Sequence, residues 1–202
     1  MAQLNETARV EAFSDGVFAI AITLLVLEIH VPPSDDKRLV AELLKLWPSY
    51  LAFLASFMTI GIMWLNHHRL FTLIKTSDDG LIVINLAVLL GITWIPFPTA
   101  LVAEHLKRAE GVAAGVLYAS SFAVIAVMYN LMWRYAVKMK LCAVDVDVGA
   151  ITRQYSIIPV MYFVLVGVAF INGTAVLIAS AVYAVYFSMP PSLWRRKSRS
   201  QA

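Results

Sequence analysis

The chain has 202 residues, of which 60% are hydrophobic and only 14% are charged. Soluble domains carry roughly a quarter charged residues, so this composition excludes a soluble globular protein and indicates a single membrane domain. The net charge is +3. The basic residues lie between apolar runs and at the C-terminus, which is typical of the cytoplasmic surface of a membrane protein and not of a protein that binds nucleic acid.

Six segments are long and apolar enough to cross a bilayer, which takes roughly 20 helical residues each. The first stops before Pro32, the second begins at Pro48, which suits a first helical turn, and the sixth ends at Pro190. Residues 36–47 mix leucines with charges and are expected to lie along the membrane surface. The pattern predicts an all-α integral membrane bundle with spans at residues 9–31, 48–72, 80–102, 111–137, 150–171 and 174–189.

The positions of the lysines and arginines predict the orientation of the bundle. If the N-terminus is cytoplasmic, eleven of them lie on the inner side, and the outer side holds only five, namely Lys37, Arg38, Lys45, Lys107 and Arg108. With six spans, both termini are then cytoplasmic. The basic tail at residues 191–202 is interpreted as a topology anchor, although its arginines also suit contact with anionic lipid.

Polar side chains within the spans need partners, because a charge at the centre of a membrane helix costs about 2.5–3.5 kcal/mol. The first span carries four of them near its inner end: Arg9, Glu11, Ser14 and Asp15. Candidate partners at the same depth are Trp64, His67, His68 and Asn85. The sequence predicts a buried network between the first three spans, with a simple interfacial position of Ser14 and Asp15 as the alternative.

The two adjacent histidines do not predict a fixed metal site. Neighbouring side chains diverge on a helix, and no clustered carboxylate or thiolate accompanies His67 and His68 in the sequence. No cofactor is expected. A membrane enzyme is disfavoured because no nucleophile or metal motif accompanies the histidines and Asp15.

A helical wheel of the first span separates two faces. Ile20, Thr23, Leu24 and Leu27 share one face, and Asp15 points away from it. The wheel alone leaves open whether the apolar face meets lipid, protein or a pore.

The stretch from Arg9 to Ile29 contains Arg-x-x-x-Phe-Ser-Asp at residues 9–15 and closely resembles the first-helix signature of the transmembrane protein 175 family. The segment WLNHHRLF at 64–71 and the segment 85–99, which ends in PFPT, support the resemblance. It implies a homotetrameric, potassium-permeable cation channel in a prokaryotic plasma membrane, with the pore lined by the first helix of each subunit.

The resemblance also implies roles for individual residues. The tightest constriction matches Ile20, potassium passes near a hydroxyl ring at Thr23, and a further apolar layer matches Leu27, with Leu24 beside it. The arginine, serine and aspartate of the signature tie the first helix to the next two helices. By analogy, the partners are Trp64, His67 or His68, and Asn85.

No Thr-Val-Gly-Tyr-Gly segment is present, so a ring of backbone carbonyls is not expected to select the ion. The main alternative is a secondary transporter or proton-permeable carrier, which needs a midplane site with ionisable residues. The six apolar runs carry few such residues at their centres. A passive structural membrane protein is the remaining alternative, which a flux assay excludes.

Overall fold

The computed structural model describes residues 5–31, 38–106, 111–144 and 146–188. Within them the chain is almost entirely helical, which confirms the predicted all-α class. The helices are α1 (Ala8–Leu24), α2 (Leu39–Lys45), α3 (Trp47–Leu73), α4 (Asp79–Trp94), α5 (Pro96–His105), α6 (Gly111–Lys138), α7 (Val148–Ala169) and α8 (Gly173–Ser188). A 3-10 turn, η1 (Leu25–Glu28), follows α1, and two short strands are β1 (Asn5–Glu6) and β2 (Thr76–Ser77).

Among the described residues, five helical segments are long and apolar enough to cross a membrane: α1 with η1, α3, α4 with α5, α6 and α7. The apolar part of α8, Gly173–Val185, is shorter. These segments form the predicted membrane bundle. The basic tail predicted at residues 191–202 lies outside the described residues.

Two predicted spans differ from the observed helices. The span predicted at 80–102 is divided, because Pro96 has no N–H to donate to the carbonyl of Ile92; α4 ends at Trp94 and α5 starts at Pro96. The span predicted at 9–31 is shorter. After Leu24 the backbone tightens into η1, and Ile29 is already extended.

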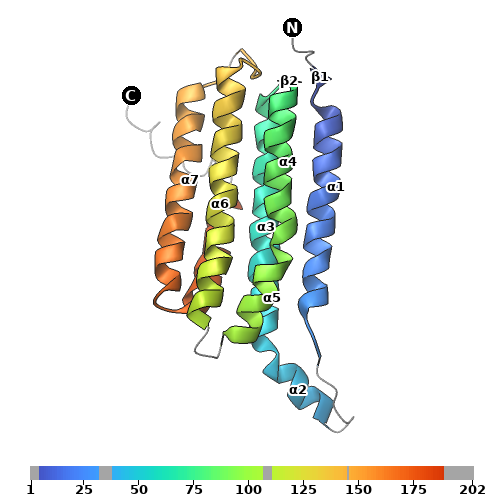
Figure 1. Cartoon of the computed structure of the whole chain (residues 1–202), viewed down its shortest axis with the longest axis vertical. Helices are drawn as coiled ribbons and strands as arrows, with labels where there is room; N and C mark the ends of the chain where they lie inside the picture. The colour runs from blue at the N-terminus through green and yellow to red at the C-terminus, as the bar shows by residue number, and fades with distance from the viewer. Residues whose placement is uncertain (1–4, 32–37, 107–110, 145, 189–202) are drawn as a thin grey trace, which may run out of the picture.

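The helices form a bundle in which α1 and α7 lie on opposite sides, with α3, α4 and α6 between them (Figure 1). Burial follows this order, since 56% of the most apolar window of α6 is buried, against 22% of that of α1. Trp133, Tyr118 and Phe122 of α6 are among the largest fully buried side chains. The core therefore lies around α6, and α1 is peripheral in the single chain.

The N-terminal segment meets the α3–α4 and α6–α7 connections at one end of the bundle, here called the strand end. β1 pairs antiparallel with β2, with Asn5 opposite Ser77. The segment before β2 also pairs with the α6–α7 connection, through an isolated bridge between Ile74 and Cys142 and a hydrogen bond from the Lys75 N–H to the Leu141 carbonyl (2.9 Å). The short α2 lies at the opposite end (Figure 1).

Candidate functional site

One face of α1 and η1 packs against the rest of the chain. Its buried residues, Ser14, Phe18, Ala21 and Leu25, follow one another at spacings of four, three and four, which places them on a single helical face. Ala21 and Leu25 are fully buried. This face fixes the helix against α3 and α4 and thereby determines which residues remain uncovered.

The uncovered side of α1 and η1 carries the four residues that the sequence wheel grouped together. The exposed fractions are 60% for Ile20, 39% for Leu24 and 65% for Leu27, and Thr23 is also exposed. The Thr23 hydroxyl donates to the Ile20 carbonyl (2.9 Å). Its hydroxyl proton is thus used within the helix, so the lone pairs of Oγ1 are free to face outward.

A buried polar chain joins α1, α4 and α3. Nδ2 of Asn85 donates to Oγ of Ser14 (3.0 Å), and Ser14 in turn donates to the Val10 carbonyl (2.7 Å). Nε2 of His67 lies 2.9 Å from Oδ1 of Asn85. Because that amide oxygen can only accept, the His67 Nε2 carries the proton in this arrangement. The exposed fractions of Ser14, His67 and Asn85 are 1% or less.

Asp15 has a separate partner on α3. The Trp64 indole N–H donates to Oδ1 of Asp15 (2.8 Å). The ring of Trp64 stacks on His68, with centroids 6.2 Å apart, and His68 is exposed. Of the two histidines, the structure brings only His67 into the hydrogen-bonded chain that reaches α1. The ring of His67 also stacks on the ring of Phe71, with centroids 4.6 Å apart.

Arg9 has no carboxylate partner among the described residues, whose one ion pair joins Lys45 to Glu42. It is exposed and lines an open groove of about 600 Å³ between α1 and α4, together with Phe13 and Asn85. The structure of the single chain therefore brings Ser14, Asp15, Trp64, His67 and Asn85 together and leaves Arg9 and His68 at the edge of the network.

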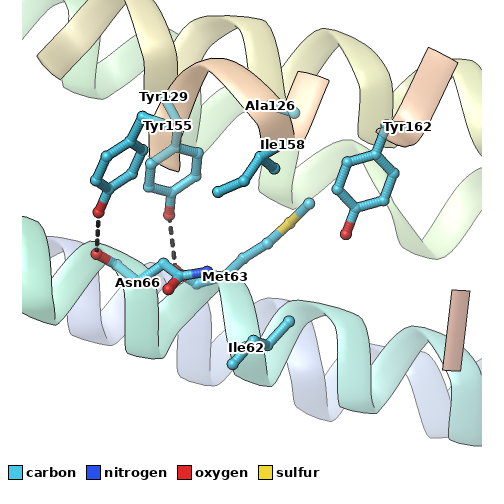
Figure 2. Close-up of a pocket in the computed structure, with 8 residues that line it drawn as sticks. All are labelled: Ile62, Met63, Asn66, Ala126, Tyr129, Tyr155, Ile158 and Tyr162. Atoms are coloured by element: carbon cyan, nitrogen blue, oxygen red, sulfur yellow. Dashed lines mark hydrogen bonds between the residues drawn. The ribbon is translucent and has the colours of Figure 1, made fainter. Parts of the chain in front are cut away.

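The sequence analysis did not identify a tyrosine cluster between α3, α6 and α7. Tyr129 donates to the Met63 carbonyl (3.0 Å), and Tyr155 donates to the Asn66 carbonyl (3.3 Å). With Tyr162 they line a cavity of about 30 Å³ (Figure 2). This volume holds about two water molecules and is far below the roughly 300 Å³ of a small-molecule site. The seven-residue spacing of Tyr155 and Tyr162 was the available sequence signal.

The described residues contain no group of three or more His, Cys, Asp or Glu side chains arranged to hold a metal ion. The main feature of the site is thus α1, which has one buried face held by the polar network and one exposed apolar face.

Comparisons with known proteins identify the family. The sequence model of the family described as "Endosomal/lysosomal potassium channel TMEM175" matches residues 9–96. The chain is 46% identical to a protein of Chamaesiphon minutus named as a potassium channel, over 92% of this chain and 95% of that protein. It is 40% identical to a protein of Streptomyces collinus that is also named as a potassium channel, over 91% and 92% of the two chains.

A solved structure agrees with these sequence relatives. The crystal structure of a lysosomal potassium-selective channel TMEM175 homolog from Chamaesiphon minutus matches with a TM-score of 0.81 and 45% identity, over 90% of this chain and 96% of that chain. Both the sequence and the fold thus agree along nearly the whole length. The chain belongs to the TMEM175 family.

Proposed function

We propose that the chain is one subunit of a homotetrameric, potassium-permeable channel in a prokaryotic plasma membrane, and that α1 of each subunit lines the pore. Membership of the TMEM175 family and the two full-length relatives named as potassium channels support ion permeation and not catalysis. The proposal includes no cofactor, and potassium is the permeant ion.

The observation that carries the pore assignment is the uncovered face of α1. Ile20 and Leu27 are among the more exposed large apolar residues of the chain, although they lie directly beside a fully buried face of the same helix. In a tetramer with α1 at the axis, each of these residues forms a ring of four. An apolar ring controls permeation by excluding water, and the outward lone pairs of Thr23 offer oxygen to a partly dehydrated cation.

Asp15 supports the assembly by its depth. It lies seven residues after the start of α1, or about 10 Å into the span, and it is exposed in the single chain. A carboxylate exposed to lipid at that depth is unfavourable. Neighbouring subunits packed against this side of α1 remove the exposure, whereas a monomer surrounded by lipid does not.

The transporter alternative is less well supported. It needs a midplane site for a substrate, built from ionisable groups and broken helices. The cavity between α3, α6 and α7 holds only about two waters, and two of its tyrosines, Tyr129 and Tyr155, hydrogen-bond to backbone carbonyls. The larger open groove beside Arg9 lies near the first turns of α1 and α4, at the strand end and not at the midplane. We also propose that the strand end is cytoplasmic, since eleven lysines and arginines then face inward and five outward.

The decisive test is potassium flux into liposomes that contain the purified protein. We expect the wild type to conduct potassium in preference to sodium, and Ile20→Asn to conduct about tenfold more, which corresponds to a permeation barrier lower by about 1.4 kcal/mol. Val26→Asn is the matched control, because Val26 is also an exposed apolar residue but points to a different side of the helix.

The control is expected to conduct like the wild type. The pore assignment is wrong if Ile20→Asn and Leu27→Asn both leave the flux unchanged, or if Val26→Asn raises it as much as Ile20→Asn does. A wild type that carries no ion under any imposed voltage or pH gradient contradicts the channel assignment itself.

A further inference from the structure

Arg134 lies in a membrane-spanning helix without an acidic partner. Its Nε donates to Oδ1 of Asn130 (2.7 Å), and its Nη2 donates to Oγ of Ser156 on α7 (3.1 Å). Neither partner is charged, and the one ion pair of the described residues is elsewhere. A guanidinium has five N–H donors, so donors remain free while the group is held in a fixed orientation between α6 and α7.

The position of Arg134 along α6 corresponds to the headgroup region of a bilayer. The helix has 28 residues and is therefore about 42 Å long, close to the roughly 40–45 Å of a bilayer with its headgroups. Arg134 lies four residues before the last residue of the helix, or about 6 Å from its end. On the proposed orientation, this end faces the cytoplasmic leaflet.

Two further basic side chains lie close to Arg134 and form a basic cluster with it. Lys138 lies one turn after Arg134 on α6, and Arg153 lies one turn before Ser156 on α7; both are exposed. Side chains three or four apart on a helix are neighbours. The adjacent Leu131 of α6 is 53% exposed, so apolar surface continues from this basic cluster towards the middle of the span.

The acidic residue at the start of α7 serves another purpose. Asp147 precedes the helix, and its Oδ1 accepts from the Ala150 N–H (3.0 Å), so it caps the first turn. On a helical wheel, Asp147 lies on the opposite side of α7 from the edge that carries Ser156 and Arg153. The basic cluster of Arg134, Lys138 and Arg153 is therefore exposed and bordered by apolar surface on one side.

We propose that this basic cluster binds the phosphate of an anionic phospholipid in the cytoplasmic leaflet, with Arg134 as the main ligand and Lys138 and Arg153 as supporting charges. The inference rests on the proposed function and on the proposed orientation of the strand end. In the single chain, α7 lies on the side opposite α1, with α6 beside it (Figure 1), so with α1 at the pore axis this side faces lipid. A planar guanidinium with free donors suits two oxygens of a phosphate, and the acyl chains then lie along the exposed side of α6.

The test is native mass spectrometry of the purified channel after equilibration in bilayers with equal amounts of phosphatidylglycerol and phosphatidylcholine. We expect phosphatidylglycerol to be retained in excess, and Arg134→Gln to reduce that excess by about fivefold, the typical effect of one basic residue at an anionic surface. Arg153→Gln should act in the same direction. Arg38→Gln is the control, because Arg38 is exposed at the other end of the bundle.

Inorganic phosphate at millimolar concentration distinguishes a lipid from a free anion. The proposal predicts that the retained phosphatidylglycerol is not displaced by it. The proposal is overturned if the wild type retains both lipids equally, if Arg134→Gln and Arg38→Gln have equal effects, or if free phosphate displaces the lipid. Lipid retention is measured without ion flux, so the two tests are independent. An absence of conduction contradicts the proposed channel, and an absence of selective lipid retention contradicts the lipid site.

Discussion

Replacement of Asn85 by alanine tests the polar chain that connects α1 to the rest of the bundle. Asn85 is 1% exposed and bridges two buried groups, the Ser14 hydroxyl and the His67 ring. Ser14 keeps its bond to the Val10 carbonyl. His67 loses its Nε2 partner, so the main consequence of the substitution is one buried, unpaired donor together with a small cavity.

The expected magnitude follows from these losses. An unsatisfied buried donor costs about 1–3 kcal/mol, while a hydrogen bond between membrane helices averages only about 0.6 kcal/mol, because the unfolded chain in the membrane also finds partners. Two broken bonds and one unpaired group therefore predict a loss of about 2–4 kcal/mol. For a chain of this size, such a loss lowers the unfolding temperature by roughly 4–16 °C.

The assay is thermal unfolding in detergent, followed by size-exclusion chromatography with fluorescence detection. Thr93→Ala is the matched control on the same helix, because Thr93 is exposed and bonds only to the Leu90 carbonyl of α4. A double-mutant cycle with His67→Leu isolates the pair. If Asn85→Ala unfolds within 1 °C of the control, or if the cycle gives no coupling between Asn85 and His67, this account of the network is refuted.

Two further predictions concern the strand end. A methyl group at Gly80 would overlap the Tyr135 hydroxyl, so Gly80→Ala should destabilise the protein by about 1–3 kcal/mol. A methyl group at Gly61 meets nothing within 4 Å, so Gly61→Ala should leave the unfolding temperature unchanged. Equal unfolding temperatures for the two variants would contradict the packing argument. Burial raises the pKa of the Cys142 thiol, so less thiolate is present at pH 7 and maleimide labelling should be slower than at Val144→Cys, a 99% exposed position, in a Cys142→Ser background. The gap should narrow as the pH rises through the pKa of Cys142, and equal rates at pH 7 would show that the thiol is not shielded.

The spans could be predicted from the sequence because their length and apolarity are set by the bilayer and not by contacts with other helices. The break between α4 and α5 is marked in the sequence by Pro96. The apolar run continues through this proline, however, so hydropathy predicts a single span at 80–102. The proline determines where the backbone hydrogen bonds stop, so local chemistry outweighed hydropathy at that point.

The partners within the network required the packed structure. Ser14 and Asn85 are 71 residues apart in the chain, and only the packing of α1 against α4 brings them together. The choice between His67 and His68 is similar, since adjacent positions differ by 100° on a helix, and the positions of α1 and α4 determine which of them is buried. The role of Ile20, Thr23, Leu24 and Leu27 in a pore stays a prediction, because a single chain contains no axis.

The pairing of β1 with β2 has a mechanical consequence for α1. The helix starts two residues after a strand that is hydrogen-bonded to its own chain, whereas its other end continues into η1 and an extended segment. A tilt about the paired end displaces each residue in proportion to its distance from that end. Ile20 lies about 18 Å and Leu27 about 30 Å along the axis, so a 5° tilt moves them by about 1.6 Å and 2.6 Å. In the proposed tetramer, an opening by tilt therefore widens the Leu27 ring more than the Ile20 ring.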